Sequence, residues 1–277
     1  MFDALSYPVS LVMKVLHDLL GLFASPDSGL IWLGSIVLLV VTVRLILLRP
    51  AWKQMWSARR TAQIQPQMGE LKRQHGSDQQ AYLQAVQALQ RREGISLAAG
   101  CLPLLIQMPV LFGLYHLLAD FTVTAGGGGN GIFTAADVTS FAHATMLGVP
   151  LSAAIRTPAE TLSSLAAGLT TAHVAMIVLP LLIIAAAATF VNLWRTQRRQ
   201  PATPIDAGNP MAASLSQVSK MMLWVAPIGL LVSGIAFPIP LALVFYWAVN
   251  GTWTTVQTQI MTARLDRTLP LPAPAQE

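Results

Sequence analysis

Five stretches of about 20 predominantly apolar residues recur along the chain, and they restrict its possible folds more than any other feature. They are roughly residues 30–48, 97–118, 172–194, 221–237 and 240–260. A helix of that length crosses the ~30 Å hydrocarbon core of a membrane. Because lipid offers no hydrogen-bonding partner to an open backbone, these stretches are expected to be helical. Charged residues make up only 10% of the 277 residues, against about 25% in a soluble domain. The sequence therefore predicts an all-α integral membrane protein with five transmembrane helices.

Basic residues lie mostly on one side of these predicted spans. Segment 49–96 contains eight of the 17 lysines and arginines, segment 194–220 contains four, and the tail 263–277 contains two. Cytoplasmic segments of membrane proteins carry an excess of Lys and Arg, so these three segments are expected in the cytoplasm. The N-terminus and the outer loop 119–171 then face outward. Five spans produce this arrangement, with the N-terminus outside and the C-terminus inside.

Residues 1–29 precede the first predicted span, and they indicate an extracytoplasmic amphipathic helix. Apolar residues recur with a helical period over residues 5–23, and Lys14 and Asp18 are four apart, where they can pair. Such a helix is expected to lie on the outer membrane surface, against the side of the bundle. The alternative, a sixth span, is disfavoured by Lys14, His17 and Asp18.

The cytoplasmic segment 51–94 is polar and rich in glutamine, and it predicts a helical hairpin. Its first helix is expected to bend at Pro66, and its second to begin after Ser77 or Asp78 as the N-cap. A solvated connector is the alternative interpretation. However, connections between packed helices usually have about 2–8 residues. A segment of more than forty residues therefore indicates a role of its own.

The remaining segments show no recognisable chemistry. The outer loop 119–171 contains four consecutive glycines at 126–129, and the cytoplasmic loop 195–217 is basic and rich in proline. The sequence thus divides into the amphipathic helix, a core over residues 30–262 and the short cytoplasmic tail.

Arg44 lies inside the first predicted span, among valine, leucine and isoleucine. It is four residues before Leu48, about 6 Å from the predicted boundary at 1.5 Å per residue. An arginine side chain can reach that far by snorkelling, so taken alone the residue is best interpreted as an anchor. The alternative is a functional charge, because an arginine at mid-membrane costs roughly 2.5–3.5 kcal/mol on insertion scales.

Polar and aromatic residues in other spans favour the functional interpretation of Arg44. They are Gln107 in the second span, Asn192 at the end of the third, and Tyr246, Trp247, Asn250, Trp253 and Gln257 in the fifth. Four of those in the fifth span recur at intervals of four, three and four, which places them on one helical face. No Asp or Glu lies in any predicted span, so Arg44 lacks an intramembrane carboxylate partner. We expect a shared hydrophilic cavity in which Arg44 binds a visiting anion.

Catalytic and metal-binding motifs are missing from the sequence. There is no nucleophile elbow, zinc-binding helix or pair of intramembrane aspartates. The sequence therefore predicts a protein that is not an enzyme and uses no cofactor and no metal. The main alternative function is a small-solute channel or transporter using the same cavity, although the inverted repeats typical of transporters are not detected. A membrane assembly chaperone is a further alternative.

Several stretches together resemble the YidC/Oxa1/Alb3 family of membrane protein insertases. The stretches are VRLILLRP (43–50), QPQMGELKRQHG (65–76), AGCLPLLIQMPVLFGLY (99–115), LPLLIIAAAATF (179–190) and VFYWAVNGTWTTVQTQ (244–259). They run in the family's order and extend over most of the chain. The absence of a large outer domain before the first core helix resembles the Gram-positive form.

The resemblance implies five core helices around a hydrophilic groove that is open to the cytoplasm and to lipid. It implies that Arg44 attracts acidic residues of an incoming client, that the client helix is released sideways into lipid, and that the cytoplasmic hairpin receives the client. The groove residues it implies are Arg44, Gln107, Asn192, Tyr246, Trp247, Asn250, Trp253 and Gln257. The basic residues it implies on the hairpin are Arg59, Arg60, Lys72, Arg73, Arg91 and Arg92.

The resemblance also implies partners and a location. The partners are nascent or newly made membrane proteins, membrane lipids, and components of the Sec translocon, the ribosome and the signal recognition particle, with no nucleic acid bound directly. The location is the bacterial cytoplasmic membrane.

Overall fold

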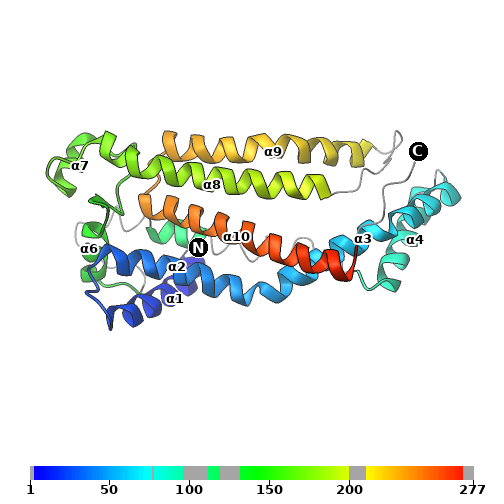
Figure 1. Ribbon diagram of the computed structural model, residues 1–277, viewed down its shortest axis with the longest axis horizontal. Helices are drawn as coiled ribbons and strands as arrows, with labels where there is room; N and C mark the ends of the chain where they lie inside the picture. The colour runs from blue at the N-terminus through cyan, green and yellow to red at the C-terminus, as the bar shows by residue number, and fades with distance from the viewer. Residues whose placement is uncertain (1–2, 77, 96–111, 119–131, 200–209, 271–277) are drawn as a thin grey trace.

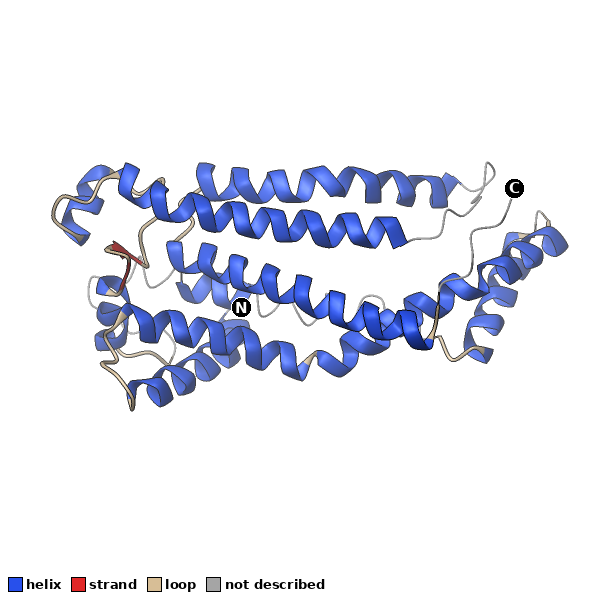
Figure 2. Ribbon diagram, viewed as in Figure 1, coloured by secondary structure: helices blue, strands red, loops and turns tan. Residues whose placement is uncertain are grey.

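The computed structural model describes residues 3–76, 78–95, 112–118, 132–199 and 210–270. Long helices dominate this part of the chain (Figures 1 and 2). The helices are α1 (Asp3–Gly21), α2 (Gly29–Ile46), α3 (Leu48–His75), α4 (Gln79–Arg92), α6 (Ala135–His143), α7 (Ala159–Leu165), α8 (Thr171–Arg199), α9 (Pro210–Ala236) and α10 (Leu241–Thr268). Residues 112–118 are also helical.

Three described helices are long and apolar enough to cross a membrane, namely residues 29–46, 171–199 and 217–236. They coincide with the first, third and fourth predicted spans, and they confirm a helical, multi-pass membrane protein. Helix α10 contains the fifth predicted span. Its 28 residues reach about 42 Å at 1.5 Å per residue, but the polar residues on it lower its hydropathy. Most of the second predicted span lies outside the described residues.

Helix α10 is central to the bundle. It packs against α8 on one side and against α2 on the other, while α9 packs against α8 (Figure 1). Lipid provides no hydrophobic driving force between spans, so close van der Waals packing at small residues holds such helices together. A Cβ atom added at Gly251 of α10 would lie 3.2 Å from the Cβ of Ala188 on α8. A Cβ atom at Gly234 of α9 would lie 2.5 Å from a methyl group of Leu182.

Helix α1 packs beside α2 through Val9 and Met13, which are buried. The predicted pair on this helix is confirmed, since Lys14 Nζ lies 2.5 Å from Asp18 Oδ1. Beyond the predicted pattern, α1 also exposes a row of apolar side chains at intervals of four residues, namely Tyr7, Leu11, Val15 and Leu19. This row suits a helix in contact with lipid at the membrane surface.

Segment 132–170, predicted only as part of the outer loop, forms a small ordered unit. It contains α6, the strands β1 (Thr145–Met146) and β2 (Val149–Pro150), and α7. The strands are antiparallel, with Thr145 opposite Pro150 and Met146 opposite Val149. Both turn residues, Leu147 and Gly148, have positive φ angles of 52° and 82°. Elements this short have too few residues to show a hydrophobic period, which explains why the sequence did not indicate them.

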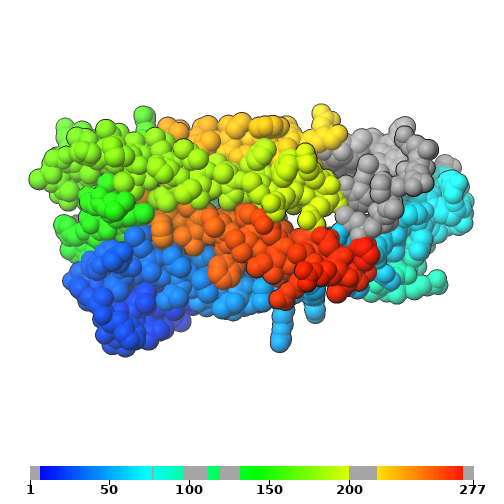
Figure 3. All heavy atoms as spheres, viewed as in Figure 1, coloured from blue at the N-terminus to red at the C-terminus, as the bar shows by residue number. Residues whose placement is uncertain are grey.

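The predicted hairpin consists of α3 and α4, which pack against each other and extend beyond the end of the bundle (Figure 3). Pro66 lies inside α3. The carboxylate of Asp78 caps α4 by accepting a hydrogen bond from the backbone N–H of Ala81 at 2.9 Å. Of the two predicted caps, Asp78 is therefore the one that the structure describes.

Candidate functional site

Arg44 reaches from α2 to α10 and is held there by neutral groups. Its Nε and Nη2 both donate to Asn250 Oδ1, at 3.2 and 2.8 Å. Nη2 also donates to Thr254 Oγ1 at 2.5 Å. Thr254 in turn donates its hydroxyl to the backbone oxygen of Asn250 at 2.7 Å, which leaves a lone pair facing the guanidinium. The guanidinium is therefore fixed against one turn of α10.

No carboxylate in the described part of the chain pairs with Arg44. Its hydrogen-bonding partners are an amide and a hydroxyl, which carry no charge. An arginine among apolar helices without a counter-ion attracts an anion, because the surroundings screen charge less than water does. The site therefore suits transient attraction of a carboxylate.

The predicted polar face of α10 extends in both directions from Asn250. Trp253 donates its indole N–H to Gln257 Oε1 at 2.8 Å, and both side chains are half-buried. In the other direction, Tyr246 is only 2% exposed and belongs to the packed core, and Trp247 is half-buried. The accessible part of this face is thus Asn250 together with Trp253 and Gln257, which lie toward the C-terminal end of α10.

Asn192 lies at a different junction from Arg44. Its side-chain Nδ2 donates to Thr255 Oγ1 at 2.9 Å, and this hydroxyl donates to the backbone oxygen of Gly251 at 3.0 Å. These groups tie α8 to α10, whereas Arg44 ties α2 to α10. The structure thus separates Asn192 from the residues around Arg44, with which the sequence had grouped it. Gln107 lies outside the described residues.

Thr254 was not predicted as a site residue, although the structure places it against Arg44. The signal available in the sequence was its position four residues after Asn250, on the same helical face. A threonine inside a helix usually donates its hydroxyl hydrogen to the backbone oxygen one turn earlier, so it looks already satisfied. Its oxygen can nevertheless accept a further hydrogen bond.

Asp266, near the C-terminal end of α10, connects this helix to α3 and α8. It forms an ion pair with Arg59 of α3, and its other oxygen accepts from Arg199 Nη1 of α8 at 2.9 Å. Partial burial alone would raise the pKa of the Asp266 carboxyl, but the hydrogen bond and charge of Arg199, together with Arg59, lower it below the ordinary value. Arg59 is only 7% exposed. In this conformation its charge is therefore engaged within the protein.

The other expected basic residues of the hairpin differ in their surroundings. Arg60 Nη2 donates to Glu93 Oε2 at 2.6 Å and thereby connects α3 to the end of α4. Arg73 pairs with Glu70 on the surface of α3, and Lys72 beside it is half-buried. The two arginines at 91 and 92 are exposed at the end of α4. The charges of these last two are therefore accessible from solvent.

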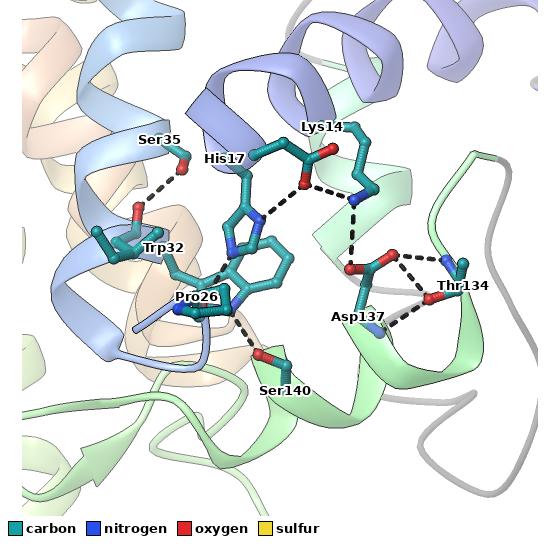
Figure 4. Close-up of polar contacts among 10 residues, drawn as sticks. Lys14, His17, Pro26, Trp32, Ser35, Thr134, Asp137 and Ser140 are labelled. Atoms are coloured by element: carbon teal, nitrogen blue, oxygen red, sulfur yellow. Dashed lines mark hydrogen bonds and ion pairs between the residues drawn. The ribbon is translucent and has the colours of Figure 1, made fainter. Parts of the chain in front are cut away.

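Side chains from α1, α2 and α6 meet near the N-terminal end of α2 (Figure 4). His17 is buried, with its ring 4.0 Å from that of Trp32 and its Nε2 3.1 Å from the backbone oxygen of Pro26. Trp32 donates its indole N–H to Ser140 Oγ at 3.2 Å. Lys14 lies 3.5 Å from Asp137 Oδ1. These contacts pack α1 and α6 against the outer end of α2.

No group of three or more His, Cys, Asp or Glu side chains in the described ranges is arranged to hold a metal ion. The described chemistry of the molecule is thus the cation at Arg44, the polar face of α10 and the charged groups around Asp266.

The fold and the site define a class, a multi-pass helical membrane protein with an uncompensated cation between two of its helices. Residues 23–268 match the family described as 60Kd inner membrane protein, and the chain belongs to this family, the YidC family. A protein of Corynebacterium efficiens is 38% identical over 98% of this chain and 70% of its own length. Proteins of Mycolicibacterium paratuberculosis and Mycobacterium tuberculosis are 34% and 33% identical over 96% of this chain, and over 76% and 74% of their own lengths. Each of the three is named membrane protein insertase YidC.

Proposed function

We propose that this chain is a membrane protein insertase that receives hydrophobic client segments at the polar face of α10 and releases them sideways into lipid. The relatives are named insertases, and this supports insertion over solute transport. The observation that carries the proposal is the guanidinium of Arg44, which Asn250 and Thr254 hold at α10 without any carboxylate from the described residues.

The mechanism needs no covalent step, and the protein is accordingly not an enzyme. A polar groove bordered by α2 and α10 shortens the apolar path that a client's polar tail must cross. Arg44 attracts acidic residues of that tail and offsets part of their desolvation cost. The hydrophobic part of the client then partitions into lipid, where its helix satisfies its own backbone.

The remaining partners and the orientation belong to the same proposal. We place the hairpin, the loop 195–217 and the C-terminus in the cytoplasm and the N-terminus outside, because most of the basic residues lie in these segments. The exposed Arg91 and Arg92 are then available to the client, or to components of the ribosome, the signal recognition particle or the Sec translocon.

Reconstitution into liposomes with a single-span client tests the proposal. The client carries a short acidic tail, and protection of that tail from external protease measures insertion. We expect Arg44→Ala to reduce insertion of this client and Arg44→Lys to retain it, because the lysine keeps the charge. Equal insertion by the wild type and Arg44→Ala would contradict the docking role. Solute flux through client-free liposomes would instead support a channel.

A further inference from the structure

The hydrogen bonds of Arg44 occupy the edges through which a guanidinium grips a carboxylate. A guanidinium has five N–H donors and forms its strongest contacts through two parallel N–H groups on one edge. Asn250 Oδ1 takes both donors of the edge formed by Nε and Nη2. Thr254 Oγ1 takes the outward N–H of Nη2, which is one half of the second edge. Within the described residues, only the two N–H groups of Nη1 lack a partner.

The amide of Asn250 is oriented by this contact. An arginine only donates hydrogen bonds, so the oxygen of the amide, and not its nitrogen, faces the guanidinium. A carboxylate oxygen in the same place would make the same two bonds with a full negative charge. The amide therefore mimics the shape of a carboxylate ligand without its charge.

We infer that Asn250 and Thr254 are positioning residues that act as placeholders for the client carboxylate at Arg44. This inference rests on the proposed docking role of Arg44. Between clients, the placeholders satisfy a cation that would otherwise be left unpaired in a poorly solvated site. When a client arrives, its carboxylate displaces a neutral oxygen from one edge, because bonds between two ionised groups are stronger than bonds to a neutral acceptor.

The placeholders also limit how long a client stays. A carboxylate must either displace Asn250 or accept only from Nη1. It therefore gains less binding free energy at Arg44 than it would gain at a guanidinium with no other partners. When the tail leaves, Asn250 Oδ1 returns to the vacated edge. The affinity for an acidic tail is thus set by how much more strongly Arg44 binds a carboxylate than the amide oxygen of Asn250. Weak binding of this kind suits a protein that releases each client.

Two substitutions at Asn250 change this competition in opposite directions. Asn250→Ala removes the competing oxygen and opens the edge formed by Nε and Nη2. Asn250→Asp keeps the shape but places a permanent carboxylate against Arg44, which excludes the client. If the amide had only a structural role, both variants would lose function. Stronger capture of an acidic tail in one variant and weaker capture in the other therefore distinguishes the two explanations.

The test uses the full chain in nanodiscs and two single-span probe peptides. One probe has a short acidic tail, and in the other every tail carboxylate is replaced by the corresponding amide. Quenching of a fluorophore on the tail measures capture and release. We expect Asn250→Ala to tighten capture of the acidic probe and slow its release by about tenfold, without changing the amide probe. We expect Asn250→Asp to reduce capture of the acidic probe to the level of Arg44→Ala.

Thr252→Val is the matched control, because Thr252 is exposed on α10 and makes no contact with Arg44. It should leave the ratio of acidic to amide capture unchanged. Weaker capture of the acidic probe by Asn250→Ala, or equal effects on both probes, would overturn the inference. If Arg44→Ala reduces acidic capture while both Asn250 variants behave like the wild type, the placeholder role fails and the docking role stands. If Arg44→Ala changes neither probe, the docking role itself fails.

Discussion

Arg59 of α3 and Asp266 of α10 form an ion pair although 207 positions separate them in the chain. The arginine is buried and the carboxylate is partly exposed, so the pair lies at the edge of the packed structure. Because Arg199 of α8 shares the same carboxylate, one acidic residue connects the hairpin to two helices of the bundle.

Substituting Asp266 should loosen the hairpin. Asp266→Asn removes the charge that Arg59 and Arg199 share, and leaves the buried Arg59 without a counter-ion. We expect a loss of about 1–3 kcal/mol in the local stability of this junction, since removing one partner of a partly buried pair costs more than losing an exposed pair. Hydrogen exchange of α3 measures the effect. Glu70→Gln, which breaks an exposed pair within α3, is the control and should cost less than about 1 kcal/mol.

The same junction should depend on pH. The pKa of the Asp266 carboxyl lies below its ordinary value of 3.8 in the folded protein. A lowered pKa means that the stabilisation is fully present above the ordinary value and is lost as the pH falls through the folded value. Exchange protection of α3 should therefore stay constant from neutral pH to about pH 4–5 and decrease below it. The decrease attributable to this group should vanish in Asp266→Asn, and an unchanged profile would argue against the assignment.

Gly29 should not tolerate a side chain. A Cβ atom at this position would lie 1.9 Å from the backbone oxygen of Thr145, so α2 and β1 could not keep their present approach. We expect Gly29→Ala to lower stability by about 1–3 kcal/mol, as overpacking does elsewhere. Thermal unfolding in detergent measures the change. Gly69→Ala in α3, where nothing lies within 4 Å, should instead be neutral or raise stability by up to about 1 kcal/mol.

Asn192 should affect stability without affecting charge discrimination. Its bond to Thr255 ties α8 to α10, and such interhelical bonds contribute about 0.6 kcal/mol on average in a membrane. Asn192→Ala should therefore change the insertion of acidic and neutral tails by the same factor. Liposome insertion of the two tails measures this, and a selective loss of the acidic tail would place Asn192 in the client site.

Local relationships were accessible from the sequence, and relationships between distant helices were accessible only in part. The pair of Lys14 and Asp18 follows from helical spacing alone, and the structure contains it. The polar face of α10 likewise follows from the spacing of its residues. The spacing does not specify which neighbouring helix packs against this polar face. The packing of α8 and α2 around α10 decides that Asn192 meets Thr255 and that Arg44 meets Asn250.

The expected role of Arg59 illustrates a second limit. From sequence it was one of several hairpin arginines, because its partner lies 207 positions away and nothing in the local pattern marks it as buried. The outer unit around β1 and β2 shows a third limit, since strands of two residues carry no periodic signal.

The 206 positions between Arg44 and Asn250 also set a condition on how this protein is made. At about 5–20 residues per second, the ribosome needs roughly 10–40 s to produce Asn250 after Arg44. During that interval α2 exists without its acceptors on α10, and its arginine depends on water or lipid headgroups for hydrogen bonds. The first span of this chain therefore enters the membrane with a charge whose acceptors on α10 are made last, and until then Arg44 is satisfied by snorkelling to the membrane surface.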